Sequence, residues 1–160
     1  MYHHGLSEEQ FAKVGKIVLN WGAADNFVGY CLNFVFKISD PEDQIDLTLV
    51  LDMRKKVDLL VKSAGRKSVS EEKTLLIKEL SSVCRLWAED RNFLAHGLGV
   101  ASADGDYSIM SGKKQKPYNI DNLDRDIERS AYVLNLAMRL NMLLAGVEWN
   151  PLGPLPSRPA

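Results

Sequence analysis

The residues with the clearest potential for chemistry stand together between Arg91 and Gly97, in the order Arg-Asn-Phe-Leu-Ala-His-Gly. A guanidinium is always cationic and donates hydrogen bonds in a planar fork, which suits a phosphate group. An imidazole ordinarily titrates at about pH 6.5 and can act as a general acid or base near neutral pH. This combination of side chains suits cleavage of a phosphodiester without a metal ion.

Helical spacing divides these candidates between two directions. Asn92 and His96 are four residues apart and share one face of a helix, whereas Arg91 points about 140° away from His96. The same spacing places a polar stripe opposite the leucine-rich face of this segment, comprising Lys78, Arg85, Glu89, Asn92 and His96. We therefore take Arg91, Asn92 and His96 as candidate catalytic residues, and Arg85 and Lys78 as candidate substrate-binding residues.

A structural interpretation of the same stretch remains open. A histidine followed by glycine is favourable at a helix C-terminus, through the helix dipole and a left-handed cap. Arg91 can also simply pair with an acid, for which Glu89, Asp90 and Asp25 are the candidates.

Apolar residues recurring at steps of three and four predict four long helices, at about residues 7–37, 41–64, 70–96 or 70–98, and 121–145. A capping box at Ser7 and Gln10 marks the first start, and Asp121 is expected to cap the last helix. The first helix is expected to bury Phe11, Val14, Ile17, Val18, Trp21, Phe27 or Val28, Cys31, Phe34 and Val35. The second is expected to bury Ile45, Leu47, Leu49, Val50, Met53, Val57, Leu59, Leu60 and Val61. The third is expected to turn Leu76, Leu80, Val83, Trp87, Leu94 and Leu98 to the core.

The segment between the last two helices has a different character. Asp104-Gly105 between short apolar stretches indicates a β-hairpin or an ordered loop. The basic run 111–117 is either a mobile flap or a plain solvated turn. The fold class expected is all-α, an up-and-down four-helix bundle with a short β-hairpin-like insertion. The domains are a flexible N-terminus (1–6), the bundle (7–146) and a proline-rich tail (147–160).

Two further features have alternative interpretations. Gly15, Gly22 and Gly29 repeat every seven residues and indicate close helix packing, either inside one chain or between two chains. The charge run at residues 54–56, Arg-Lys-Lys, indicates a solvated helix face or a phosphate-binding patch.

The bulk composition sets limits on partners and compartment. A formal net charge of -1 gives no global attraction to nucleic acid or anionic membrane. Cys31 and Cys84 lie in apolar helical contexts, so we expect reduced core thiols. The sequence shows no signal peptide, no apolar run long enough to span a membrane, no nucleotide-binding fingerprint and no metal-ligand cluster. We expect a cytoplasmic protein with no membrane association and no cofactor.

The segment from Arg91 to His96 resembles the R-x4-6-H motif of the HEPN superfamily, including the polar residue directly after the arginine. Trp21 with an acid four residues on, Asp25, is similar to bacterial HEPN-like proteins. The resemblance covers about residues 7–146. It implies a homodimer in which two motif copies face each other across a groove, and in which the RNA 2′-hydroxyl attacks the adjacent phosphate without metal.

Under this resemblance His96 is the acid/base group, Arg91 binds the phosphate, and Asn92 orients. The expected function is therefore a metal-independent endoribonuclease that acts on RNA, as a toxin with a cognate antitoxin or as an antiphage defence component. The alternative is a non-catalytic HEPN-like dimeric binding protein, in which the motif only ends a helix.

Overall fold

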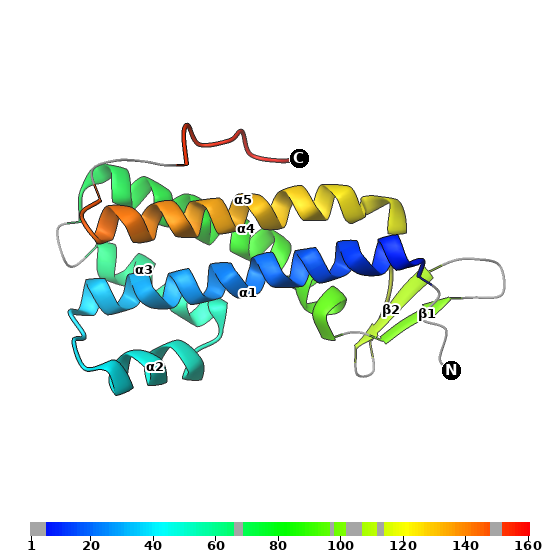
Figure 1. The fold of residues 1–160 in the computed structure, drawn as a ribbon, viewed down its shortest axis with the longest axis horizontal. Helices are drawn as coiled ribbons and strands as arrows, with labels where there is room; N and C mark the ends of the chain where they lie inside the picture. The colour runs from blue at the N-terminus through cyan, green and yellow to red at the C-terminus, as the bar shows by residue number, and fades with distance from the viewer. Residues whose placement is uncertain (1–5, 66–68, 97, 102–106, 112–113, 148–151) are drawn as a thin grey trace.

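The computed structural model describes residues 6–65, 69–96, 98–101, 107–111, 114–147 and 152–160; the side chains of some of these, including Leu47 and His96, are not described. The chain is mostly helical, as predicted (Figure 1). The elements in chain order are α1 (Glu8–Phe36), α2 (Pro41–Val50), α3 (Met53–Ala64), α4 (Glu71–His96), β1 (Leu98–Ala101), β2 (Tyr107–Ser111), β3 (Lys114–Pro117), the 3-10 turn η1 (Ile120–Asn122) and α5 (Leu123–Leu144).

The start of α1 is the predicted capping box. The Ser7 hydroxyl accepts a hydrogen bond from the Gln10 amide at 3.2 Å, and the Gln10 side chain accepts from the Ser7 amide at 2.8 Å. These two bonds satisfy amides that have no partner within the helix. The helix ends at Phe36, where Lys37 adopts the left-handed conformation with φ 56°.

The predicted second helix is wrong, because the chain breaks it into two. Leu51 is extended, and the carboxylate of Asp52 accepts a hydrogen bond from the Lys55 amide at 2.9 Å. Asp52 is thus the N-cap of a new helix, α3, just as Asp40 caps α2. The apolar pattern across this region continues through the break, so periodicity alone did not reveal it.

The break reverses the chain and changes the topology from a simple up-and-down bundle. Lys13 pairs with Asp124 at 2.9 Å, and Asn20 bonds to Ser130 at 3.0 Å. Contacts that advance together along both helices mean that α1 and α5 run parallel, as Figure 1 shows. The first and last helices of an up-and-down four-helix bundle would run antiparallel.

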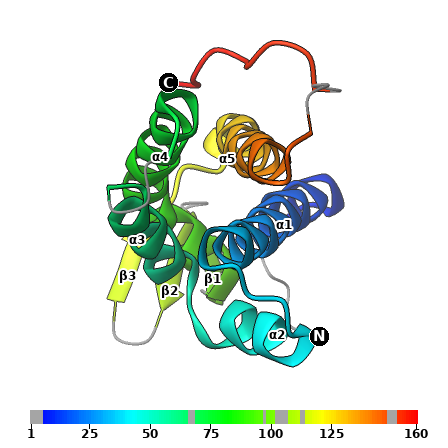
Figure 2. The same ribbon diagram turned by 90° about the vertical axis from the view of Figure 1, so that its left-hand side faces the viewer.

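Viewed end on, α1, α3, α4 and α5 surround a common core, and α2 lies outside against α1 (Figure 2). Most predicted core positions of α1 and α4 are buried, including Ile17, Trp21, Cys31, Leu80, Val83 and Trp87. Other apolar residues predicted to be buried are exposed instead, namely Phe11, Phe34, Ile45, Leu49, Val50 and Val61. Ile45, Leu49 and Val50 are exposed because α2 lies at the outside of the bundle and packs against α1.

The three glycines of α1 do not share one role. A Cβ atom on Gly29 would lie 2.8 Å from the Thr48 side chain of α2, so this glycine permits a close helix crossing inside the chain. A Cβ on Gly15 or Gly22 would meet no described atom within 4 Å. Packing within the chain therefore explains Gly29 alone.

A three-stranded antiparallel sheet in the order β1-β2-β3 follows α4. The pairing of β1 with β2 is the predicted hairpin, although its Asp104-Gly105 turn lies outside the described residues. The strand β3 differs from the prediction of a flap or a solvated turn for residues 111–117. Its polar sequence shows no strand pattern. The strand forms through backbone hydrogen bonds to β2, in which Ile109 is the partner of Lys116.

The start of α5 also differs from the prediction. Asn119, not Asp121, is the capping residue: its side chain accepts a hydrogen bond from the Asp121 amide at 3.0 Å and starts η1. The helix α5 then begins at Leu123 without a side-chain cap. No helix in the described part of the chain is both long and apolar enough to cross a membrane.

A buried ion pair fixes α3 against α1. The Lys56 ammonium lies 2.8 Å from the Asp25 carboxylate, and the lysine side chain is 1% exposed whereas the aspartate side chain is 31% exposed. A buried ammonium needs a partner because it has lost its hydration. Asp25 supplies this partner from the side of the pair that solvent can reach.

We predict that Asp25→Ala lowers the free energy of unfolding by about 3 kcal/mol, because it leaves the Lys56 ammonium buried without a partner. In the double variant Asp25→Ala/Lys56→Met, an apolar side chain of similar length should restore much of this loss. Urea denaturation of the three proteins checks the order. A double variant no more stable than Asp25→Ala would contradict the account.

Candidate functional site

A groove of about 620 Å³ lies between the start of α3 and the second half of α4. Three arginines and one asparagine are among the residues that line it, namely Arg54, Arg85, Arg91 and Asn92. The remaining lining residues are Trp21, Asp52, Met53, Cys84 and Glu89. The groove thus brings together three of the five residues selected from the sequence, namely Arg85, Arg91 and Asn92.

Arg91 and Asn92 are joined directly. An Arg91 terminal nitrogen donates to the Asn92 side-chain oxygen at 2.8 Å. The Arg91 Nε is buried and has no hydrogen-bond partner among the described residues. Arg91 therefore lies at the border between groove and core, which agrees with the helical spacing that points it away from His96. Asn92 fixes one side of this guanidinium.

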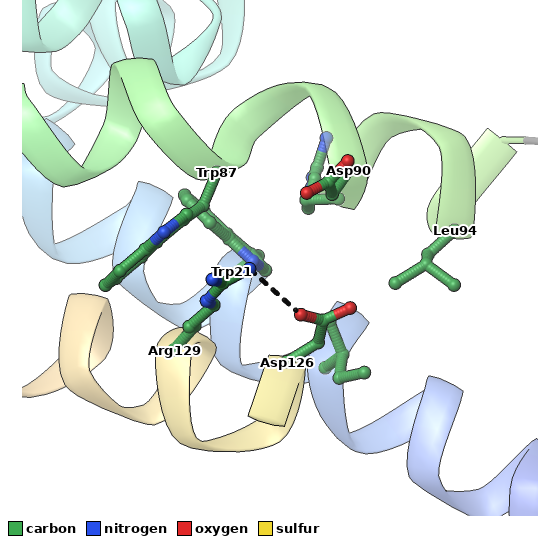
Figure 3. A pocket seen from close by; sticks show the side chains of 8 residues that line it. Trp21, Trp87, Asp90, Leu94, Asp126 and Arg129 are labelled. Carbon is green, nitrogen blue, oxygen red and sulfur yellow. Dashed lines mark hydrogen bonds and ion pairs between the residues drawn. The ribbon is translucent and has the colours of Figure 1, made fainter. Parts of the chain in front are cut away.

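A second, much smaller space lies behind Arg91 and has room for about one water molecule, about 10 Å³. Figure 3 shows Trp21, Trp87, Asp126 and Arg129 around it, from α1, α4 and α5. Asp90, Ile17, Leu94 and Arg91 complete the lining. We call this space the inner crevice. A water molecule here would be a partner for the buried Arg91 Nε.

Asp126 organises the far wall of the inner crevice. Its carboxylate accepts a hydrogen bond from the Tyr118 hydroxyl at 2.6 Å and lies 3.4 Å from nitrogens of both Arg125 and Arg129. Burial, and then the hydrogen bond to Asp126, raise the pKa of Tyr118 far above its ordinary value. The phenol is therefore a proton donor that ties the segment after β3 to α5.

The three residues of the charge run 54–56 do not act together, either as a solvated helix face or as a phosphate-binding patch. Arg54 is exposed and lines the groove, Lys55 is exposed and pairs with Asp52 at 3.0 Å, and Lys56 is buried. One residue of the three is thus available to an anion in the groove. The others hold α3 in place, one at its N-terminus and one against α1.

The structure places each of the three acids that were predicted as possible partners of Arg91. Asp25 is engaged with Lys56, whereas Asp90 lines the inner crevice together with Arg91 and Glu89 lines the groove. Two acidic residues, Asp52 and Glu89, thus line the groove together with three arginines. Hydrogen bonds from Lys55 lower the pKa of Asp52, so this carboxylate stays ionised as the cap of α3.

The other two candidate residues lie apart or outside the description. Lys78 is exposed two helical turns before Arg85 and is not among the residues that line the groove. His96 is the last residue of α4, as predicted, but its side chain and Gly97 lie outside the described residues.

Arg85, which does line the groove, reaches across to α3 and pairs with Asp58 at 3.3 Å.

Sequence reasoning named Arg54 only within the charge run 54–56, for which a phosphate-binding patch was one of two alternatives, and it missed Asp126. Asp126 had no signal, since a carboxylate in the first turn of a helix is ordinarily explained by the helix dipole. Its burial depends on the packing of α5 against α4.

Both cysteines are free and buried, as predicted, and burial raises the pKa of each thiol to about 12. They are therefore protonated core residues at neutral pH. Among the described residues, no three or more His, Cys, Asp or Glu side chains are grouped as metal ligands.

Comparisons with protein-family models, with curated proteins and with solved structures found no match to this chain.

We predict that Tyr118→Phe lowers the free energy of unfolding at pH 8 by about 1 kcal/mol, because Asp126 loses a donor. The raised pKa of Tyr118 means that the folded state holds this proton more tightly than the unfolded chain. Its contribution is complete below about pH 10 and is lost as the pH rises further. Denaturation at pH 8 and above pH 10 should show the Tyr118→Phe deficit shrinking.

The matched control is Tyr30→Phe, because Tyr30 is half-exposed and lies on α1 away from Asp126. Its effect on stability should be small and should not change over the same pH interval in the way that the effect of Tyr118→Phe does. A Tyr118→Phe deficit that stays constant above pH 10 would show that the phenol proton does not stabilise the fold.

Proposed function

We propose that this chain is a HEPN-like, metal-independent endoribonuclease whose substrate backbone lies in the groove between α3 and α4. The observation that carries the proposal is the convergence of Arg54, Arg85 and Arg91 with Asn92 in a groove of about 620 Å³. Guanidinium groups bind phosphates in a bidentate manner, and three of them along one groove suit successive phosphates of a single strand. The near-neutral chain thus has a local basic site.

The chemistry proposed is attack of the RNA 2′-hydroxyl oxygen on the adjacent phosphorus. The 2′-hydroxyl proton passes to a base, the bond to the 5′-oxygen breaks, and that oxygen takes up a proton. The products are a 2′,3′-cyclic phosphate and a free 5′-hydroxyl. His96 is the proposed acid/base group, and Arg91 stabilises the charge that develops on the phosphate oxygens.

The proposal gives Arg91 and Asn92 a shared role. Their hydrogen bond of 2.8 Å holds the guanidinium at the groove edge, so that its remaining donors can face a phosphate. In this proposal α1, α3, α4 and α5, which surround the common core, would correspond to the helices of a HEPN-like bundle. We further propose a homodimer in which the end of α4 from each copy faces the other, so that His96 of one chain acts beside Arg91 of its partner.

The biological setting proposed is a toxin with a cognate antitoxin or an antiphage defence protein. In both settings, uncontrolled activity against host RNA would be harmful, so expression of the wild-type chain should slow growth and expression of His96→Ala should not. This growth comparison complements the purified assay below.

The direct test is cleavage of end-labelled single-stranded RNA in buffer that contains a chelator. The wild type should release fragments ending in a 2′,3′-cyclic phosphate. The rate should fall by about 10² to 10⁴ in His96→Ala and by about 10² to 10³ in Arg91→Ala. In Arg54→Ala, which removes only a phosphate contact, we expect KM to rise several-fold.

The matched control is Lys62→Ala, which removes one exposed positive charge from the same helix as Arg54 but about 12 Å further along it. Its activity should equal that of the wild type. If the purified wild type leaves RNA intact and its expression does not slow growth, the enzyme proposal fails and a non-catalytic binding protein remains.

A further inference from the structure

The proline-rich segment 152–160 is not a free tail. In Figure 1 it runs back along the bundle on the side of α4 and α5. Arg139 and Arg129 of α5 reach its backbone, and Glu79 of α4 reaches its Arg158 side chain.

The backbone of this segment is bound at both ends. A terminal nitrogen of Arg139 donates to the carbonyl oxygens of Leu152 at 3.1 Å and Pro154 at 2.9 Å. At the other end, the Arg129 Nε donates to the carbonyl oxygen of Ala160 at 2.8 Å. These donors recognise an extended backbone whatever its side chains. Proline suits such a strand because it favours the extended polyproline conformation.

One side chain of the segment is recognised specifically. The Arg158 guanidinium lies 3.6 Å from the Glu79 carboxylate and 5.7 Å from the centre of the Trp87 ring. The Tyr132 hydroxyl donates to the same carboxylate at 3.2 Å and so holds Glu79 in place. A carboxylate beside an aromatic face is a site built for a cation, and for a planar guanidinium in particular.

The segment contributes little apolar burial of its own. Residues 153–158 are all exposed, including Leu155, whereas the residues that bind it are largely buried: Trp87, Tyr132 and Arg139 are each less than 9% exposed. The surface on α4 and α5 is therefore the better-formed half of this contact. When the segment leaves, Arg139 and Arg129 lose acceptors and Glu79 loses a cation.

From these contacts we propose that the α4–α5 face is a binding site for a proline-rich segment of a partner protein, one that offers backbone carbonyls and an arginine. Residues 152–160 occupy the site in the isolated chain and must leave before such a partner binds. The occupant is defined by the groups that the face presents: two guanidinium donors for an extended backbone, and the Glu79–Trp87 pair for an arginine. This proposal is independent of the proposed nuclease activity.

The test uses a fluorescent peptide with the sequence of residues 152–160, capped at both ends, and the full-length protein. In the wild type the attached segment competes at an effective concentration of roughly millimolar, so the peptide should bind weakly. The Arg158→Glu protein places a second carboxylate beside Glu79 and should release its own segment. We expect it to bind the peptide at least about tenfold more tightly than the wild type.

Specificity is tested with a peptide carrying Arg158→Ala, which leaves the protein unchanged and should bind Arg158→Glu protein roughly tenfold more weakly. Adding Glu79→Gln to that protein should weaken binding of the original peptide similarly. Thermal unfolding confirms that each variant is folded. The proposal is overturned if Arg158→Glu protein shows no saturable binding, binds no better than the wild type, or binds both peptides equally.

Discussion

The contact between Lys56 and Asp25 determines where the rest of the site can be. A lysine that is 1% exposed lies near the start of α3, and its carboxylate partner lies in the middle of α1. The pair holds α3 against α1 at one level, and Asp52 sets where α3 begins. Arg54 then emerges opposite Arg85 and Arg91 of α4, because it precedes Lys56 by two residues and points away from the core. The groove therefore depends on an ion pair outside it.

The inner crevice behind Arg91 and the α4–α5 face share two side chains. Trp87 and Arg129 line the inner crevice behind Arg91, and both also contact the segment 152–160. The Arg129 guanidinium lies 5.3 Å from the centre of the Trp87 ring and pairs with Asp126. Two side chains thus belong both to the α4–α5 face and to the wall of the crevice that Arg91 also lines.

The elements that could be predicted from the sequence are those decided locally. The capping box at Ser7, the end of α4 at His96 and the buried arc from Leu80 to Trp87 follow from spacing and side-chain chemistry within one helix. The break at Leu51 could not be read in this way, because apolar residues continue on both sides of it. Its consequence, a parallel α1 and α5, is a property of the whole chain path.

The same distinction applies to the candidate site. Arg91, Asn92 and Arg85 were found because one helix carries all three. Arg54 belongs to another helix, and its place in the groove depends on the Lys56 pair, which spacing did not indicate. Asp126 and Tyr118 are joined only through the path between β3 and α5. Asp126 lines the inner crevice together with Arg91, although the two residues are far apart in the sequence.

We propose that the α3–α4 groove holds a phosphodiester backbone, and an NMR titration of the arginine Nε–Hε signals tests this directly. The ligand is a 2′-O-methyl RNA, which cannot be cleaved by 2′-hydroxyl attack. We expect the signals of Arg54, Arg85 and Arg91 to shift together and to saturate at one concentration, while that of Arg139 does not shift. Shifts confined to other arginines, or no shift at all, would contradict the proposal.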